Sequence, residues 1–223
     1  MSAPVPDTPV IPVLPPSIDK PTQRRRRGAA QDELREQIRL AVKTQHNLGG
    51  YGAVTMRGVA QAVGISAMSL YRYFPNKSAM LESIWAEALE ASLQSAIQGS
   101  AAASEPWARL RQLYEAYANF WLTHPDDFKL VFDPCNEVSA NFLASGPAAG
   151  FRQQYESMID TCLGEGIGLA QRQQCHDLCR LKIVGFLFTT VGLATKPATP
   201  VAALLQLTLD DIEQQLMRIK NGR

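Results

Sequence analysis

Apolar residues recur at helical spacing along nearly the whole chain after residue 29, and no alternating strand pattern persists. Leu34, Ile38 and Val42 lie on one face of a first helix, which begins at about Ala29 and ends at the flexible pair Gly49-Gly50. The same reasoning predicts further helices over residues 55–63, 67–74, 76 to beyond 85, 106–124, 126–132, 150–163, 170–195 and 200–219. The fold class is therefore predicted to be all-α, with about nine helices.

Two short helices joined by a tight turn are predicted over residues 55–74. Thr55 and Ser66 are good N-caps, because a hydroxyl oxygen accepts a hydrogen bond from a backbone N–H of the first turn. Gly64 can adopt the positive φ that a sharp reversal between helices needs. Val59 on the first helix and Leu70 on the second supply a shared core. This is the helix-turn-helix arrangement, whose second helix enters the major groove of DNA.

The outer face of the second helix carries small, polar and aromatic side chains. Small residues at its start let the backbone approach the bases, while Tyr71, Arg72 and Tyr73 can reach base edges or phosphates. Lys77 lies in the first turn of the next helix, where a cation opposes the helix dipole unless a phosphate binds there. The pattern predicts a DNA-binding face. The alternative is that Tyr71, beside Leu70, belongs to the core and that Arg72 is merely solvated.

Residues 55–80 resemble the DNA-binding signature of the TetR family of transcriptional repressors, and the resemblance weakens beyond residue 85. The matching residues are Thr55, Arg57, Val59, Ala60, Val63, Gly64, Ile65, Ser66, Leu70, Tyr71, Tyr73, Phe74, Lys77 and Met80. The resemblance implies a dimeric repressor that is released from DNA when its C-terminal domain binds a small molecule. The DNA contacts that it implies are Thr55, Arg57, Ala67, Met68, Ser69, Tyr71, Arg72, Tyr73 and Lys77. Ala67 and Met68 depart from the polar residues common there.

The positive charge of the chain is confined to one segment. Residues 24–81 hold ten basic and three acidic side chains, a net charge of +7, whereas residues 82–223 carry a net charge of −5. Arg24, Arg25, Arg26 and Arg27 repel one another, so this basic arm should stay unfolded until a polyanion neutralises it. We expect the arm to follow the DNA backbone or minor groove, with a solvated tail as the alternative.

These patterns divide the chain into three expected parts. Residues 1–28 comprise a proline-rich tail, extended or disordered, together with the basic arm. Residues 29–75 form the helix-turn-helix domain, and residues 76–223 form a larger helical domain for ligand binding and dimerisation. The aromatic residues of that last part are mostly core, but some should line an apolar cavity between helices. The candidates are Tyr117, Trp121, Phe128 and Tyr155, for a small apolar or aromatic effector.

Dimerisation is expected to use the last two helices. Residues 181–194 are apolar nearly all round, and Gly185 and Gly192 lie on one face, where a partner helix could approach closely. Together the two helices suit a four-helix interface between two subunits, which would pair two recognition helices on a pseudo-palindromic operator. The expected interface residues are Gly185, Phe188, Gly192, Leu205, Leu209, Ile212 and Leu216. The alternative is that both helices are buried inside one subunit.

Other functions receive little support. Cys175, His176 and Cys179 lack a fourth ligand at metal-site spacing, so structural cysteines are expected, with no metal and no cofactor. No signal pattern or membrane-length apolar stretch occurs, and the four cysteines do not form a disulfide framework, which indicates a cytoplasmic protein. A helical enzyme or carrier that binds an anionic cofactor through the basic segment is an alternative, but no catalytic motif accompanies it. An architectural DNA binder would have little use for the aromatic C-terminal domain.

Overall fold

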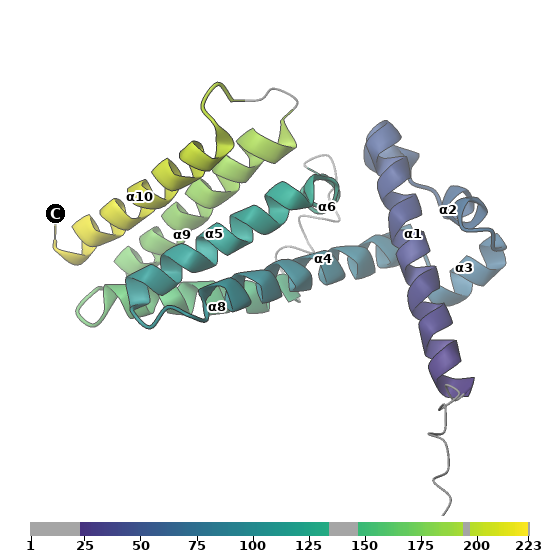
Figure 1. Cartoon of the computed structure of the whole chain (residues 1–223), viewed down its shortest axis with the longest axis horizontal. Helices are drawn as coiled ribbons and strands as arrows, with labels where there is room; N and C mark the ends of the chain where they lie inside the picture. Colours follow the sequence, from purple (N-terminus) through teal and green to yellow (C-terminus); the bar gives the residue numbers. More distant parts are fainter. Residues whose placement is uncertain (1–22, 134–146, 194–196, 223) are drawn as a thin grey trace, which may run out of the picture. The chain divides into compact units, whose positions relative to one another are not determined.

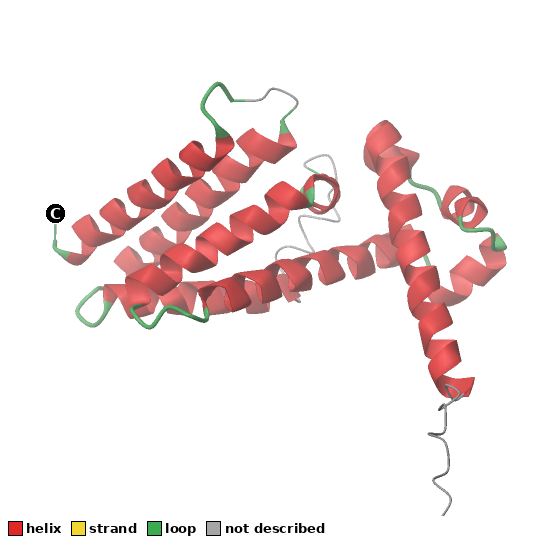
Figure 2. Cartoon of the chain, viewed as in Figure 1, coloured by secondary structure: helices red, strands yellow, loops and turns green. Residues whose placement is uncertain are grey.

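The computed structural model describes residues 23–133, 147–193 and 197–222 of the chain. The described residues hold nine α-helices and one π-helical turn, with no strand among them, which confirms the all-α expectation (Figures 1 and 2). The chain divides into two compact units, residues 1–36 and residues 37–223. No helix in the described ranges has the length and apolar character needed to cross a membrane.

Helix α1 spans Gln23–Ala53 and begins earlier than the sequence predicts. The backbone of residues 24–27 is helical, so the expectation that this arginine run is unfolded is wrong. Arginine and glutamine are good helix formers, and each residue added to an existing helix gains one hydrogen bond, which outweighs the repulsion between like charges. The predicted end of the helix is confirmed by non-helical dihedral angles at Gly49 and at Gly50, whose φ is +65°.

Three capped helices follow in the order that the sequence predicts. Helices α2 (Met56–Ala62), α3 (Ala67–Tyr73) and α4 (Lys77–Ser100) begin after Thr55, Ser66 and Asn76. Each cap oxygen accepts a hydrogen bond from the backbone N–H three residues on, at 3.0, 3.0 and 2.8 Å respectively. Gly64 between α2 and α3 has a φ of +72°, a conformation that a side chain would strain.

The remaining helices form a bundle with α4. They are α5 (Pro106–Thr123), α6 (Pro125–Val131), α8 (Pro147–Leu163), α9 (Leu169–Leu187) and α10 (Val201–Lys220). The helix expected over 170–195 instead passes into a π-helical turn, η1 (Phe188–Gly192), and Leu193 is extended. The bundle core includes Trp85, Tyr114 and Trp121, each at most 1% exposed. Helices α9 and α10 pack along each other, as do α4 and α5 (Figure 1).

Candidate nucleic-acid interface

The helix-turn-helix is held together by a small apolar core. Val59 and Leu70 are fully buried and Ala60 is 2% exposed, so α3 crosses close to α2. Ile65 after the turn donates its backbone N–H to the carbonyl of Ala60 at 3.0 Å, and Gly64 donates to Gln61 at 3.2 Å. These bonds fix the direction in which α3 leaves the turn. The buried core and the turn therefore hold the outer face of α3 in a fixed orientation.

That outer face is exposed and carries large side chains. Met68 is 73% exposed, and Tyr71 and Tyr73 are each 47% exposed. Arg72, between the two tyrosines, is exposed as well. The structure therefore excludes the alternative that Tyr71 is a core residue. This helix of seven residues thus exposes a methionine, two tyrosines and an arginine, which offer apolar, hydrogen-bonding and cationic groups.

Several expected DNA-contact residues also have structural partners. The hydroxyl of Ser69 lies 2.9 Å from that of Ser66, next to the N-cap bond of α3. The hydroxyl of Thr55 caps α2, and the backbone N–H of Thr55 donates to the side-chain oxygen of Gln45 at 3.2 Å. A Cβ at Gly58 would lie 2.9 Å from the Thr55 hydroxyl, so a side chain at position 58 would crowd this cap. Arg57 is exposed beside it, while Ala67 and Ser69 are half-buried.

Lys77 is bound to the segment that precedes α2. Its ammonium donates a hydrogen bond to the backbone carbonyl of Tyr51 and lies 3.6 Å from the centre of the Tyr51 ring. Partial burial lowers the pKa of Lys77 from its usual value. The cation at the start of α4 is thus compensated by a carbonyl and by the face of an aromatic ring. This contact could not be predicted from the sequence, because Tyr51 lies among glycines outside any periodic pattern.

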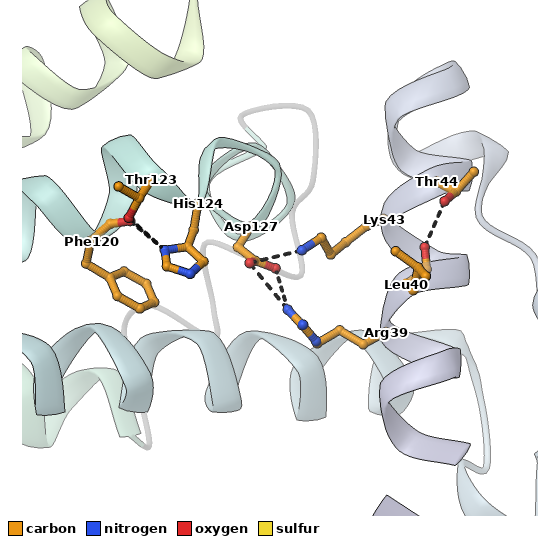
Figure 3. A network of polar contacts seen from close by, with 8 residues as sticks. All are labelled: Arg39, Leu40, Lys43, Thr44, Phe120, Thr123, His124 and Asp127. Atoms are coloured by element: carbon orange, nitrogen blue, oxygen red, sulfur yellow. Dashed lines mark hydrogen bonds and ion pairs between the residues drawn. The ribbon is translucent and has the colours of Figure 1, made fainter. Parts of the chain in front are cut away.

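A second group of charged residues links α1 to α6, as Figure 3 shows. The carboxylate of Asp127, a residue only 3% exposed, accepts hydrogen bonds from Arg39 at 3.3 and 3.4 Å and from Lys43 at 3.1 Å. Farther along α1, the Nε2 atom of His46 lies 3.0 Å from the carboxylate of Asp133. One carboxylate in the first turn of α6 and one just after its end therefore bind successive turns of α1, the helix that precedes the helix-turn-helix.

The sequence reasoning missed this contact. Asp127 follows the His124-Pro125 pair and reads as an ordinary acidic residue in the first turn of a helix. His124 itself ends α5: its Nδ1 atom lies 2.8 Å from the carbonyl of Phe120, and the two rings stack (Figure 3). The spacing of Arg39 and Lys43 by one helical turn was the available signal, but it did not identify the partner.

The four candidate ligand residues do not form one group. Trp121 contacts both Tyr117 and Phe128, with ring centres 6.2 and 5.8 Å apart, and all three are buried. Tyr155 instead packs edge-on against Tyr114, at 4.6 Å. Burial raises the pKa of Tyr117 to about 12 and that of Tyr155 well above its usual value, so both phenols stay protonated.

The expected dimer residues fall into two classes. Leu205, Leu209, Ile212 and Leu216 are at most 3% exposed and pack within the same chain, as the alternative interpretation had it. Phe188 is half-buried, with its ring centre 5.3 Å from that of Phe128, while Gly185 and Gly192 are exposed. The outer face of α9 and α10 leaves other apolar side chains free for a partner, namely Leu181 at 74% and Leu207 at 60% exposure.

The cysteine and histidine positions of α9 have structural roles. Cys175 and Cys179 are fully buried, and burial raises the pKa of Cys179 to about 12. The Nε2 atom of His176 lies 3.0 Å from the carboxylate of Asp160 on α8. Within the described ranges, no cluster of three or more histidine, cysteine or acidic residues could hold a metal ion.

The basic arm, residues 24–27, has a helical backbone, and its contact with DNA stays a prediction.

Comparisons with known proteins agree with this geometry. Residues 41–84 match the family model described as bacterial regulatory proteins, tetR family. The chain is 43% identical over 61 residues to the HTH-type transcriptional repressor KstR of Rhodococcus jostii, covering 27% of this chain and 29% of that repressor. It is 36% identical over 81 residues to KstR of Mycolicibacterium smegmatis, covering 36% of this chain and 40% of that repressor. The aligned regions thus span less than half the length of these relatives.

Solved structures extend the similarity over most of the fold. The fatty acid degradation regulator FadR from Bacillus halodurans superposes with a TM-score of 0.67 at 14% identity, covering 80% of this chain and 93% of that one. A TetR-family transcriptional regulator from Bordetella parapertussis superposes with a TM-score of 0.61 at 16% identity, covering 81% and 94%. At these identities the likeness concerns the fold alone.

Proposed function

We propose that this chain, whose residues 41–84 match the family model described as bacterial regulatory proteins, tetR family, is a transcriptional repressor. The observation that carries the proposal is the exposed outer face of α3. This seven-residue helix is capped by Ser66, anchored by the buried Leu70, and presents Met68, Tyr71 and Arg72 outward. Such a helix fits the major groove, where side chains near its N-terminus meet base edges. Its place of action would be the bacterial cytoplasm.

The exposed side chains suggest a division of roles on DNA. Arg72 can donate two hydrogen bonds to a guanine edge, and Met68 can make apolar contact with a thymine methyl group. Tyr71 and Tyr73 can contact bases or phosphates through their hydroxyl groups. Arg57 at the start of α2 is suited to a phosphate. Ala67, Ser69 and Thr55 bring the backbone N–H groups of the helix starts close to the DNA.

Lys77 would bind a DNA phosphate while Tyr51 holds it in place. An ammonium has three N–H donors, and only one is needed for the carbonyl of Tyr51. The basic arm, Arg24 to Arg27, would add contacts to the backbone or minor groove from the first turns of α1. These contacts are independent of sequence, so they supply affinity and salt dependence rather than specificity.

A homodimer would read two half-sites of a pseudo-palindromic operator. The outer face of α9 and α10 supports this arrangement, because it exposes Leu181, Leu207 and Gly185 on adjoining helices. A partner's pair of helices could cover this surface and complete a four-helix interface. The domain that contains it, residues 76–223, would also bind the small-molecule effector. The ion pairs of Asp127 and Asp133 with α1 would carry the response toward the DNA-binding helices.

The test is DNA binding measured by fluorescence anisotropy, with the DNA upstream of the protein's own gene and with random DNA. Tyr71→Ala and Arg72→Ala should each weaken specific binding by roughly 1–3 kcal/mol and leave binding to random DNA nearly unchanged. Arg218→Ala removes an exposed arginine of α10 and serves as the matched control. Wild-type affinity in a folded Arg72 variant would contradict the proposed role of α3.

A further inference from the structure

A cavity of about 410 Å³ lies between α4, α5 and α8. Its size falls in the range of roughly 300–1,000 Å³ that small-molecule sites usually have. Leu93 and Ile97 of α4, Leu113 of α5 and Met158 of α8 give it an apolar wall, to which the buried ring of Tyr155 adds. The cavity is separate from the cluster around Trp121 and Phe128, because neither residue lines it.

The polar part of the cavity has one sign of charge. Arg109 is its one charged residue among the described lining residues, and the others with polar side chains are the neutral Ser100, Gln153, Gln154, Ser157 and Tyr155. Burial raises the pKa of Tyr155, so its phenol stays neutral. With no described acidic residue in the lining, the cavity favours an anion over a cation.

Arg109 differs from the other arginine on its helix. Arg111, two residues on, is bound to Asp210 at 2.7 Å and to the side-chain oxygen of Gln206 at 2.6 Å. No such partner is found for Arg109 among the described residues, although Arg109, an exposed residue, lines a cavity with an apolar wall. A guanidinium matches the two oxygens of a carboxylate, which it can bind with two parallel hydrogen bonds.

We propose that this cavity is the binding site for an amphipathic carboxylate. The apolar chain of the ligand lies against Leu93, Ile97 and Leu113, and its carboxylate pairs with the guanidinium of Arg109 while the amides of Gln153 and Gln154 add donors. The further claim that this carboxylate is the effector rests on the proposed function. The binding itself does not depend on DNA.

The binding test uses the full-length protein without DNA and three probes of equal chain length, titrated by calorimetry below their aggregation limits. Decanoate should bind saturably, and decan-1-ol and decylammonium at least tenfold more weakly. Arg109→Gln should weaken decanoate at least tenfold and leave decan-1-ol unchanged, because a charge-assisted pair is worth more than a neutral contact. Arg109→Lys should restore part of the loss. Leu93→Trp, which fills the cavity, should weaken decanoate and decan-1-ol alike.

Arg111→Gln is the matched control, since it removes an arginine of the same helix that does not line the cavity. Equal binding of decanoate and decan-1-ol, or unchanged decanoate binding in Arg109→Gln, would overturn the carboxylate site. A second titration adds decanoate to the protein bound to DNA, where release is expected in the wild type and not in Arg109→Gln. Decanoate binding without release would keep the site and overturn its effector role, whereas a failure to bind DNA at all would overturn the proposed function alone.

Discussion

Replacing Asp127 by asparagine is expected to destabilise the protein far more than replacing its neighbour Asp126. The substitution keeps the shape of the side chain and removes its charge, so Arg39 and Lys43 lose the partner that lies 3.1–3.4 Å away. Removing one member of a buried ion pair usually costs about 3–5 kcal/mol. The side chains of Arg39 and Lys43 keep 29% and 17% of their exposure, so water replaces part of the lost interaction. We therefore expect a loss of about 1–3 kcal/mol.

The measurement is urea unfolding at a fixed protein concentration, because assembly would make the midpoint depend on concentration. Asp126→Asn is the control: Asp126 lies in the same first turn of α6 and has the same favourable interaction with the helix dipole, but no ion pair with α1 is found for it among the described residues. The difference between the two variants then isolates the contact with α1. Equal losses of stability in the two variants would refute the reasoning, since the helix dipole alone would then account for both.

Four further results are expected. Lys77→Ala should weaken binding to specific and random DNA alike and lower the slope of log affinity against log salt concentration by about one unit, as expected for one lost phosphate contact. An unchanged slope would contradict the phosphate contact and leave the interaction with Tyr51 as the role of Lys77. Replacing Arg24 to Arg27 by glutamine should lower DNA affinity and its salt dependence without changing the urea midpoint, whereas equal affinity at moderate salt would make the arm a solvated segment. Gly185→Arg should convert the dimer to a folded monomer in sedimentation experiments, because the added Cβ meets no atom within 4 Å among the described residues outside its own stretch of α9. A wild type that is already monomeric would refute the dimer. The thiols of Cys162 and Cys179, whose pKa burial raises to about 11 and about 12, should resist alkylation at pH 8 until the protein unfolds, and fast labelling in the native state would contradict their burial.

Those features of the site that depend on neighbouring residues could be predicted from the sequence. The caps at Thr55 and Ser66 and the positive φ of Gly64 involve atoms no more than a few residues apart, so composition and spacing were enough to predict them. The DNA-binding face of α3 was predicted in the same way, but the position of Tyr71 next to the buried Leu70 left a core role for Tyr71 open, which its 47% exposure excludes. The start of α1 was harder, because helix propensity and charge repulsion oppose each other in the arginine run.

Contacts across the chain could not be predicted in the same way. Asp127 lies 88 residues from Arg39 and 84 from Lys43, and a single sequence carries no record of which basic residue a carboxylate will meet. The wide apolar surface of the last two helices raised a related problem. An apolar stripe that is too broad for packing against one neighbouring element indicates that the helix packs against two. The stripe does not show which of its side chains face the same chain and which face a partner. In the structure Leu205 and Leu209 face inward while Leu207 is exposed, so the two predicted interface leucines pack within the chain and other side chains are left on the surface. The residues free to meet a partner therefore had to come from tertiary packing, and Gly185→Arg tests that exposed face rather than the buried one.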